Sequence, residues 1–86
     1  MTDIIKVQTF SAPQNTVNAG TSAVFNFEVT APSGYSTVGV IGYYTNSEFI
    51  FPIRITKNRM DVRNCGSSNQ TITPTITVLF IKTDMI

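Results

Sequence analysis

The sequence contains no histidine and no tryptophan, and only one of its 86 residues is a cysteine. Without histidine, the chain lacks the side chain that most often serves as a general base or a metal ligand. A single cysteine, Cys65, cannot form an intrachain disulfide, which excludes the disulfide framework of a small secreted domain. We therefore expect no enzymatic activity, no metal and no cofactor, and we expect synthesis in a reducing cytoplasm.

Charged residues are also scarce, at 13% of the chain against about 25% in an average protein, and the formal net charge is +1. This balance gives no long-range attraction to nucleic acid or to a membrane surface. No apolar run approaches the ~20 residues of a membrane-spanning helix. Residues 1–10 also lack the basic start and apolar core of a signal peptide. We expect neither a nucleic-acid partner nor membrane insertion.

What the chain does contain is apolar and hydroxyl-bearing residues. Hydrophobic residues make up 42% of the sequence, and threonine, serine and asparagine fill most of the rest. A chain of this length is a single domain, residues 1–86, and buries only about 60% of its unfolded surface. With so small a core, some apolar surface is expected to remain exposed on the single chain, and another chain could cover it.

The stretch Gly34–Ile55 predicts a β-hairpin around a short polar turn, Thr45–Ser47. β-Branched and aromatic residues on both sides of turn-forming residues are the usual signal for a hairpin. Asparagine at position 46 fits this prediction, because it tolerates the left-handed backbone of a tight turn.

Apolar and polar residues alternate elsewhere, which predicts further strands at residues 4–10, 23–30, 60–64 and 71–82. Short strands at regular spacing indicate an all-β fold, an antiparallel β-sandwich of jelly-roll type with six to eight strands. The predicted core residues are Phe25, Phe27, Val29, Val38, Val40, Phe51, Ile53, Ile76 and Val78. At Leu79–Ile81 both faces of the last strand are apolar, so we expect this end to be covered on two sides, as in a homotrimer.

The candidate chemical groups point away from catalysis. The five acidic residues are scattered over different predicted strands, and Cys65 has no histidine to activate it. Four basic residues fall close together, and this cluster is either a patch for an acidic ligand or an ordinary solvated hairpin: Arg54, Lys57, Arg59 and Arg63. The solvated hairpin is the favoured interpretation, with Asp61 partly neutralising the cluster.

Tyrosines near predicted turns offer a more specific signal. A tyrosine ring can stack on a sugar while its hydroxyl forms a hydrogen bond, although tyrosine also caps cores and packs between subunits. Tyr43 and Tyr44 precede the turn and should point to opposite faces, and the one nearer the turn is favoured. The predicted ligand-binding residues, in the turn and in the loop 65–70, are Tyr44, Thr45, Asn46, Ser47 and Asn69.

Three stretches carry a resemblance to a known family: AGTSAVFNFEVTAPSGYSTVGVIGYYTNS, FPIRI and TITVLFIK. Together they span most of Gly20–Ile81, and they resemble the C-terminal head domains of bacteriophage and prophage tail fibres and baseplate receptor-binding proteins. The closing LFIK departs from the pattern, which has tyrosine where this chain has Phe80. The resemblance implies a trimeric β-sandwich head in the virion, made in the host cytoplasm and attached to a cell-surface saccharide or protein.

The function expected from these observations is therefore receptor binding by a virion attachment module. Two alternatives remain open. One is a purely structural trimerisation or capping module of a virion. The other is a carbohydrate-binding module of a bacterial surface protein.

Overall fold

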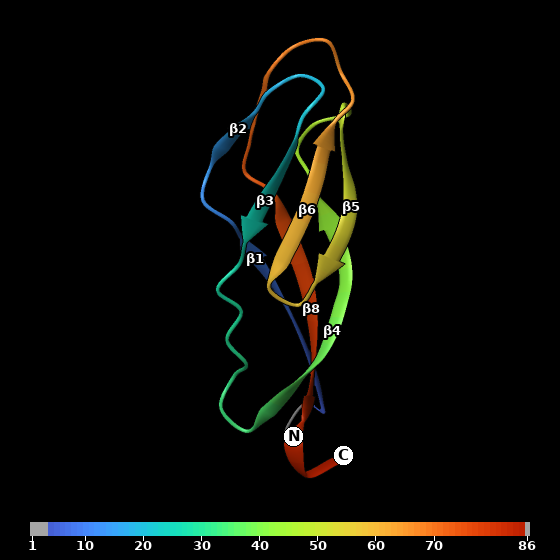
Figure 1. The fold of residues 1–86 in the computed structure, drawn as a ribbon. Coiled ribbons are helices and arrows are strands. Elements are labelled where there is room, and N and C mark those ends of the chain that lie inside the picture. The colour runs from blue at the N-terminus through green and yellow to red at the C-terminus, as the bar shows by residue number, and fades with distance from the viewer. Residues whose placement is uncertain (1–3, 86) are drawn as a thin grey trace.

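The computed structural model describes residues 4–85, which form an elongated all-β molecule measuring 50 × 18 × 17 Å (Figure 1). A single 3₁₀ turn, η1 (Thr83–Met85), follows the last strand. The strands in chain order are β1 (Ile5–Ser11), β2 (Asn15–Val17), β3 (Ser22–Asn26), β4 (Tyr35–Tyr44), β5 (Ile50–Thr56), β6 (Arg59–Asn64), β7 (Gln70–Ile72) and β8 (Thr75–Lys82).

The strands form three antiparallel sheets. The first has the order β1-β8-β4, the second has the order β3-β6-β5, and β2 pairs with β7 in a small third sheet. In the first sheet the central strand is β8, which is the last in sequence. The antiparallel all-β class predicted from the sequence is confirmed.

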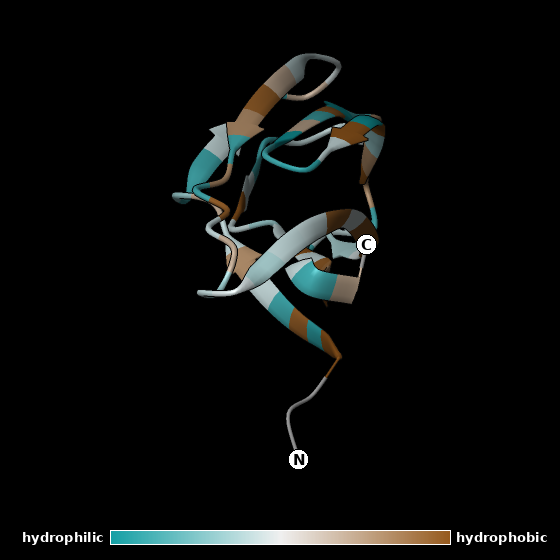
Figure 2. Ribbon diagram, turned by 90° about the horizontal axis from the view of Figure 1, so that it is seen from below, coloured by the Kyte–Doolittle hydropathy of each residue, from teal (hydrophilic) through white to brown (hydrophobic). Residues whose placement is uncertain are grey.

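The core forms where the two larger sheets turn apolar faces inward. On β8 the inward residues are Ile76, Val78 and Phe80, all with 0% exposure, and on β6 they are Met60 and Val62, also with 0% exposure. These residues belong to one buried cluster, which joins both sheets. Because strand side chains alternate between faces, bands of opposite hydropathy follow one another along the strands in Figure 2.

The predicted hairpin Gly34–Ile55 is wrong. β4 pairs with β8 and β5 pairs with β6, so the two strands belong to different sheets. The segment between them does turn, and Asn46 has a positive φ of 64°. The buried Thr45 hydroxyl donates to the carbonyl oxygens of Ser47 and Ile50, at 2.9 and 3.1 Å. These bonds direct the chain from one sheet to the other instead of back along β4.

The predicted core is confirmed in part. Phe25, Phe27, Ile76 and Val78 are buried, and Val29 and Val40 are half-buried against them.

Val38, Phe51 and Ile53 are instead 57%, 54% and 62% exposed, so their assignment to the core was wrong. β4 has a register shift between Thr37 and Gly39, and β5 has one between Pro52 and Arg54. The bulge of β4 breaks the alternation of faces at Val38, and the sequence pattern does not reveal it. On β5, Phe51 pairs with Arg63 on the outward face and the buried Ile50 lies on the inward face, so the prediction chose the wrong face of this strand.

Several strand boundaries also differ from the prediction. The strand expected at 71–82 is two strands, β7 and β8, because the buried Pro74 interrupts it and accepts a hydrogen bond from the amide of Ala12 at 3.1 Å. The strand expected at 23–30 ends at Asn26, after which the Phe27 amide bonds to the carbonyl of Asn58 at 2.8 Å. The strand expected at 60–64 is confirmed as β6, and a turn at Lys57–Asn58 precedes it.

Replacement of Phe27 tests this core assignment. Phe27 is 4% exposed, so Phe27→Ala should lower the free energy of unfolding by about 3–5 kcal/mol, the usual range for a buried phenylalanine. Phe51→Ala is the matched control, because Phe51 is 54% exposed, and it should cost less than about 1 kcal/mol. Denaturant unfolding measures both values, and equal losses would contradict the assignment.

Candidate functional site

Three loops meet at one end of the molecule, opposite the end where β1 begins and β8 ends (Figure 1). We call residues 18–21, 45–49 and 65–70 the loop cluster. The Ser47 Oγ donates to Gln70 Oε1 at 3.3 Å, and the Ala19 amide donates to Asn69 Oδ1 at 2.9 Å. The amide of Cys65 donates to the carbonyl of Phe49 at 2.9 Å. The structure therefore brings together the predicted turn and the predicted loop, and adds a third segment to them.

The loop cluster is held by Asn64, the last residue of β6, which is 0% exposed. Its Nδ2 group donates to the carbonyls of Val17 and Ser68, both at 2.9 Å, and its Oδ1 accepts from the amide of Gly66 at 2.9 Å. Its backbone carbonyl accepts from the Gly20 amide at 3.0 Å. A buried amide that satisfies all these groups fixes the loops in one arrangement. The role of Asn64 was not predicted from the sequence. A polar residue is common at the end of a strand, and nothing in the sequence distinguishes Asn64 from such a residue.

The predicted ligand-binding residues differ in what they can contact. Tyr44 is 62% exposed, and Asn46 is also exposed at the tip of its turn. Thr45 is 6% exposed and its hydroxyl is used within the turn, so it positions the turn and is not open to a ligand. The side chains of Ser47 and Asn69 take part in bonds between loops.

The tyrosines lie where the alternation of β4 places them. Tyr44 is opposite Thr75, on the outward side of the first sheet, and Tyr43 is opposite the buried Ile76, on the inward side. Tyr43 is nevertheless 53% exposed. Tyr35 is half-buried against the core, with Lys6 Nζ 4.8 Å from its ring centroid. Of the three rings, Tyr44 is the most exposed and the nearest to the turn.

A groove of about 640 Å³ lies between the β1–β2 segment and β3. Sequence reasoning missed it, because it forms only when residues 10–15 and 24–28 come together. Its volume falls in the range of ligand pockets, about 300–1,000 Å³. Amides, one carboxylate and the edge of an aromatic ring line it, from Gln14, Asn15, Asn26, Glu28 and Phe10.

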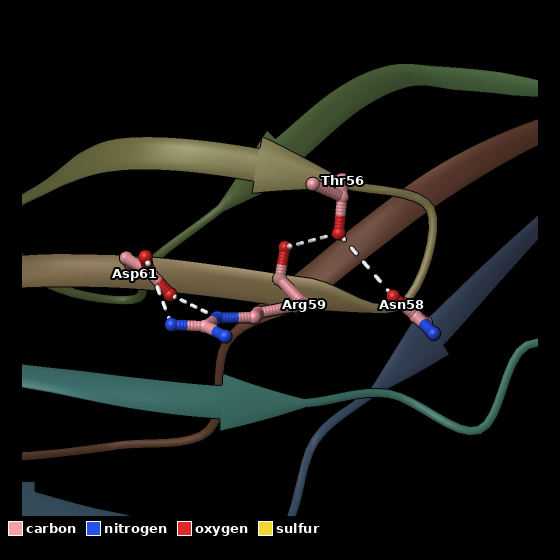
Figure 3. A network of polar contacts seen from close by, with 4 residues as sticks. All are labelled: Thr56, Asn58, Arg59 and Asp61. Carbon is pink, nitrogen blue, oxygen red and sulfur yellow. Dashed lines mark hydrogen bonds and ion pairs between the residues drawn. The ribbon is translucent and has the colours of Figure 1, made fainter.

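The basic cluster is spread over the outward face of the second sheet. Arg59 and Asp61 form a two-point ion pair, with Nε to Oδ1 at 2.6 Å and Nη2 to Oδ2 at 3.3 Å (Figure 3). The hydrogen bond from Arg59 lowers the pKa of Asp61 below its usual value, and Asp61 in turn raises the pKa of Arg59. Arg63 donates to the hydroxyl of Ser22 at 3.4 Å. These contacts favour the interpretation as a solvated hairpin.

Residues 4–85 contain no group of three or more metal-ligating side chains. Over the same residues, no helix is long and apolar enough to cross a membrane. Cys65 is an exposed free thiol in the loop cluster.

Replacement of Asn64 tests its role as the anchor of the loop cluster. Asn64→Ala leaves the carbonyls of Val17 and Ser68 and the amide of Gly66 without their partner. Since each unsatisfied buried group costs about 1–3 kcal/mol, the free energy of unfolding should fall by about 3 kcal/mol or more. The exposed Asn26 supplies the control, and Asn26→Ala should change stability by no more than about 0.5 kcal/mol. Indistinguishable unfolding curves for the two variants would show that Asn64 is not the anchor.

Titration of Asp61 tests the ion pair. In the folded chain its pKa should lie below 3.8, so the stabilisation from the pair is complete above the unfolded pKa and is lost as the pH falls through the folded pKa. Arg59→Gln should return the pKa of Asp61 toward its ordinary value, while Arg63→Gln should leave it lowered. Carboxyl chemical shifts in an NMR titration measure each pKa, and an unchanged value in Arg59→Gln would contradict the pairing.

Comparison with known proteins identifies no relative: no family model, no curated protein and no solved structure matches this chain. Its function is therefore argued from its own surfaces. The two surfaces with polar groups arranged to meet a ligand are the loop cluster and the groove beside β3.

Proposed function

We propose that this chain is the receptor-binding head of a bacteriophage tail fibre or baseplate, which attaches the virion to a saccharide or protein on the host cell. The observation that carries the proposal is the loop cluster, a polar end of an elongated molecule whose loops are fixed by the buried Asn64. The resemblance of the strand sequences to such heads adds support.

The loop cluster suits a weak, specific contact with sugar hydroxyls. Loops that are fixed before binding lose little conformational entropy when the ligand arrives. The exposed Tyr44 ring offers a stacking surface and a hydroxyl, and the Asn46 amide offers both a donor and an acceptor. Neutral polar groups of this kind match an uncharged saccharide better than a strongly charged ligand.

The proposed architecture and assembly follow from the same reasoning. The two larger sheets enclose a shared core, which supports a β-sandwich. We propose that three copies assemble into a head, made in the host cytoplasm and carried on the virion. Three weak sites on one rigid head gain affinity through effective concentration.

A structural trimerisation or capping module is the second candidate. Its supporting observation is that Thr45, Ser47 and Asn69 use their side chains to hold the loops together. A module that only closes the end of a fibre needs such internal bonds and needs no exposed stacking ring. The exposure of Tyr44 favours attachment over this alternative.

Binding by a tyrosine variant tests the proposal. Tyr44→Ala should weaken binding of the assembled protein to host cells or to a glycan array by at least tenfold, since an exposed anchor residue contributes about 1–3 kcal/mol per site. Tyr43→Ala is the matched control, because its ring has similar exposure and lies on the other side of β4. It should bind as the wild type does.

Melting temperature shows whether each variant is folded. Equal binding by Tyr44→Ala and wild type would place the receptor site elsewhere, with the groove beside β3 as the next surface to test. A folded, assembled wild-type protein that binds neither cells nor glycans would favour the structural module.

A further inference from the structure

The first residues of β1 have polar side chains on the core side of the sheet and apolar side chains on the outward side. A strand that buried its apolar face in the core of its own domain would have the reverse arrangement. Lys6 pairs with Phe80 and Gln8 pairs with Val78, and both partners have 0% exposure, so the polar side chains lie on the core side of the sheet. Ile5 and Val7 lie on the outward side and are 54% and 53% exposed. A shift of one residue in register would reverse this arrangement. The observed register therefore presents Ile5 and Val7 away from the core, whereas Phe10, farther along β1, packs against it.

The neighbouring strand continues this apolar surface. Ile5 is opposite Ile81 and Val7 is opposite Leu79, which gives two adjacent cross-strand pairs on the outward face. Leu79 and Ile81 are half-buried. Across β8, Gly39 is opposite Leu79, and the exposed Val38 precedes it at the bulge of β4. We call Ile5, Val7, Leu79 and Ile81, with Val38 beside them, the aliphatic patch.

The outward face of the first sheet also lacks charge. Every residue paired in register on this face is apolar or neutral: Ile5, Val7, Thr9, Ser11, Ser36, Gly39, Gly42, Tyr44, Thr75, Thr77, Leu79 and Ile81. The hydroxyls of Thr9 and Thr77 lie 3.3 Å apart and bond to each other, so covering them leaves few unpaired polar groups.

The second sheet shows what a solvent-facing surface of this chain looks like. Its outward face also exposes Val24 and Phe51, but it carries charged residues among them, and two of these form an ion pair (Figure 3): Arg54, Arg59, Asp61 and Arg63. The same chain thus gives one outward face charged groups and gives the other none. This contrast indicates that the aliphatic patch is covered by another molecule.

We propose that a second copy of this chain covers the aliphatic patch. Ile5, Val7 and Val38 are each more than half exposed, and such a cluster supplies an apolar centre for an interface in which each partner buries ~800 Å². A neutral face can meet its own copy without repulsion between like charges, whereas an unlike partner selected by charge would find nothing to recognise. In a closed three-fold assembly, the patches of the three copies would converge on the axis, and each would pack against those of the other two copies.

The aliphatic patch is the contact surface that we propose for the assembly described above, so this inference rests on the proposed function. The patch lies near the end of the molecule where β1 begins. The outward Tyr44 is opposite Thr75, four residues along β8 from Leu79, or about 13 Å from the nearer end of the patch at ~3.3 Å per residue. Assembly through the patch therefore leaves the loop cluster open.

A matched pair of valine variants tests the proposal. Val7 and Val24 both lie on edge strands and face outward, with exposures of 53% and 45%, but Val24 is on the charged sheet opposite Asp61. By light scattering, the wild type should have a mass of about three times the 9.4 kDa chain, as a closed three-fold assembly does. Val7→Lys should fall to the monomer mass at the same concentration, and Val24→Lys should keep the wild-type mass. Ile5→Lys is a second patch variant, and it decides the result if Val7→Lys fails to fold by circular dichroism.

Three outcomes would overturn the proposal. They are a wild type that stays monomeric at every concentration, a folded patch variant that keeps the wild-type mass, and a Val24→Lys variant that dissociates as much as Val7→Lys. Binding to cells or glycans is measured separately on the same samples. A wild type that assembles through the patch but binds no receptor contradicts the attachment function alone. A monomeric wild type that binds weakly contradicts the patch alone.

Discussion

The arrangement of the loops depends on one buried amide. Asn64 ends β6 with no exposed surface, and its side chain bonds to two carbonyls and one amide from segments that lie apart in the chain. An apolar residue of the same size would fill the space but leave three backbone groups unpaired, each at a cost of about 1–3 kcal/mol. In so small a domain that is a large share of the total stability. The end of the molecule that we assign to receptor binding therefore gains its rigidity from an interaction within the core.

The two large sheets share this core but present different surfaces. On the second sheet, an extra residue at the bulge after Pro52 places Arg54 outward with Arg59 and Asp61, where water solvates the charges. On the first sheet, no outward residue that is paired in register carries a charge. The division is understandable if one face meets solvent and the other meets a further copy of the chain.

Alternation in the sequence was sufficient to predict an all-β chain and the burial of Phe25, Phe27, Ile76 and Val78. It could not predict which strands pair, because the pairing of β4 with β8 depends on contacts between residues far apart in the chain. It also failed at the bulge of β4, where Val38 breaks the period of two, and on β5, where it placed the exposed Phe51 and Ile53 in the core. Within the candidate site, Tyr44 and Asn46 are exposed as predicted, but the burial of Thr45 and the role of Asn64 depend on how separate loops meet.

The central position of β8 has a consequence for synthesis on the ribosome. β8 is translated after both of its neighbours, β1 and β4, and neither neighbour has another strand partner in that sheet. The second sheet can pair before the first, because β3, β5 and β6 all precede β8 in the chain. The first sheet must wait, with the backbone of β1 unpaired. Proteins dominated by such non-local pairings fold slowly, in milliseconds to seconds. A newly made chain therefore exposes the unpaired backbone and the apolar side chains of β1 until β8 is available to pair with it.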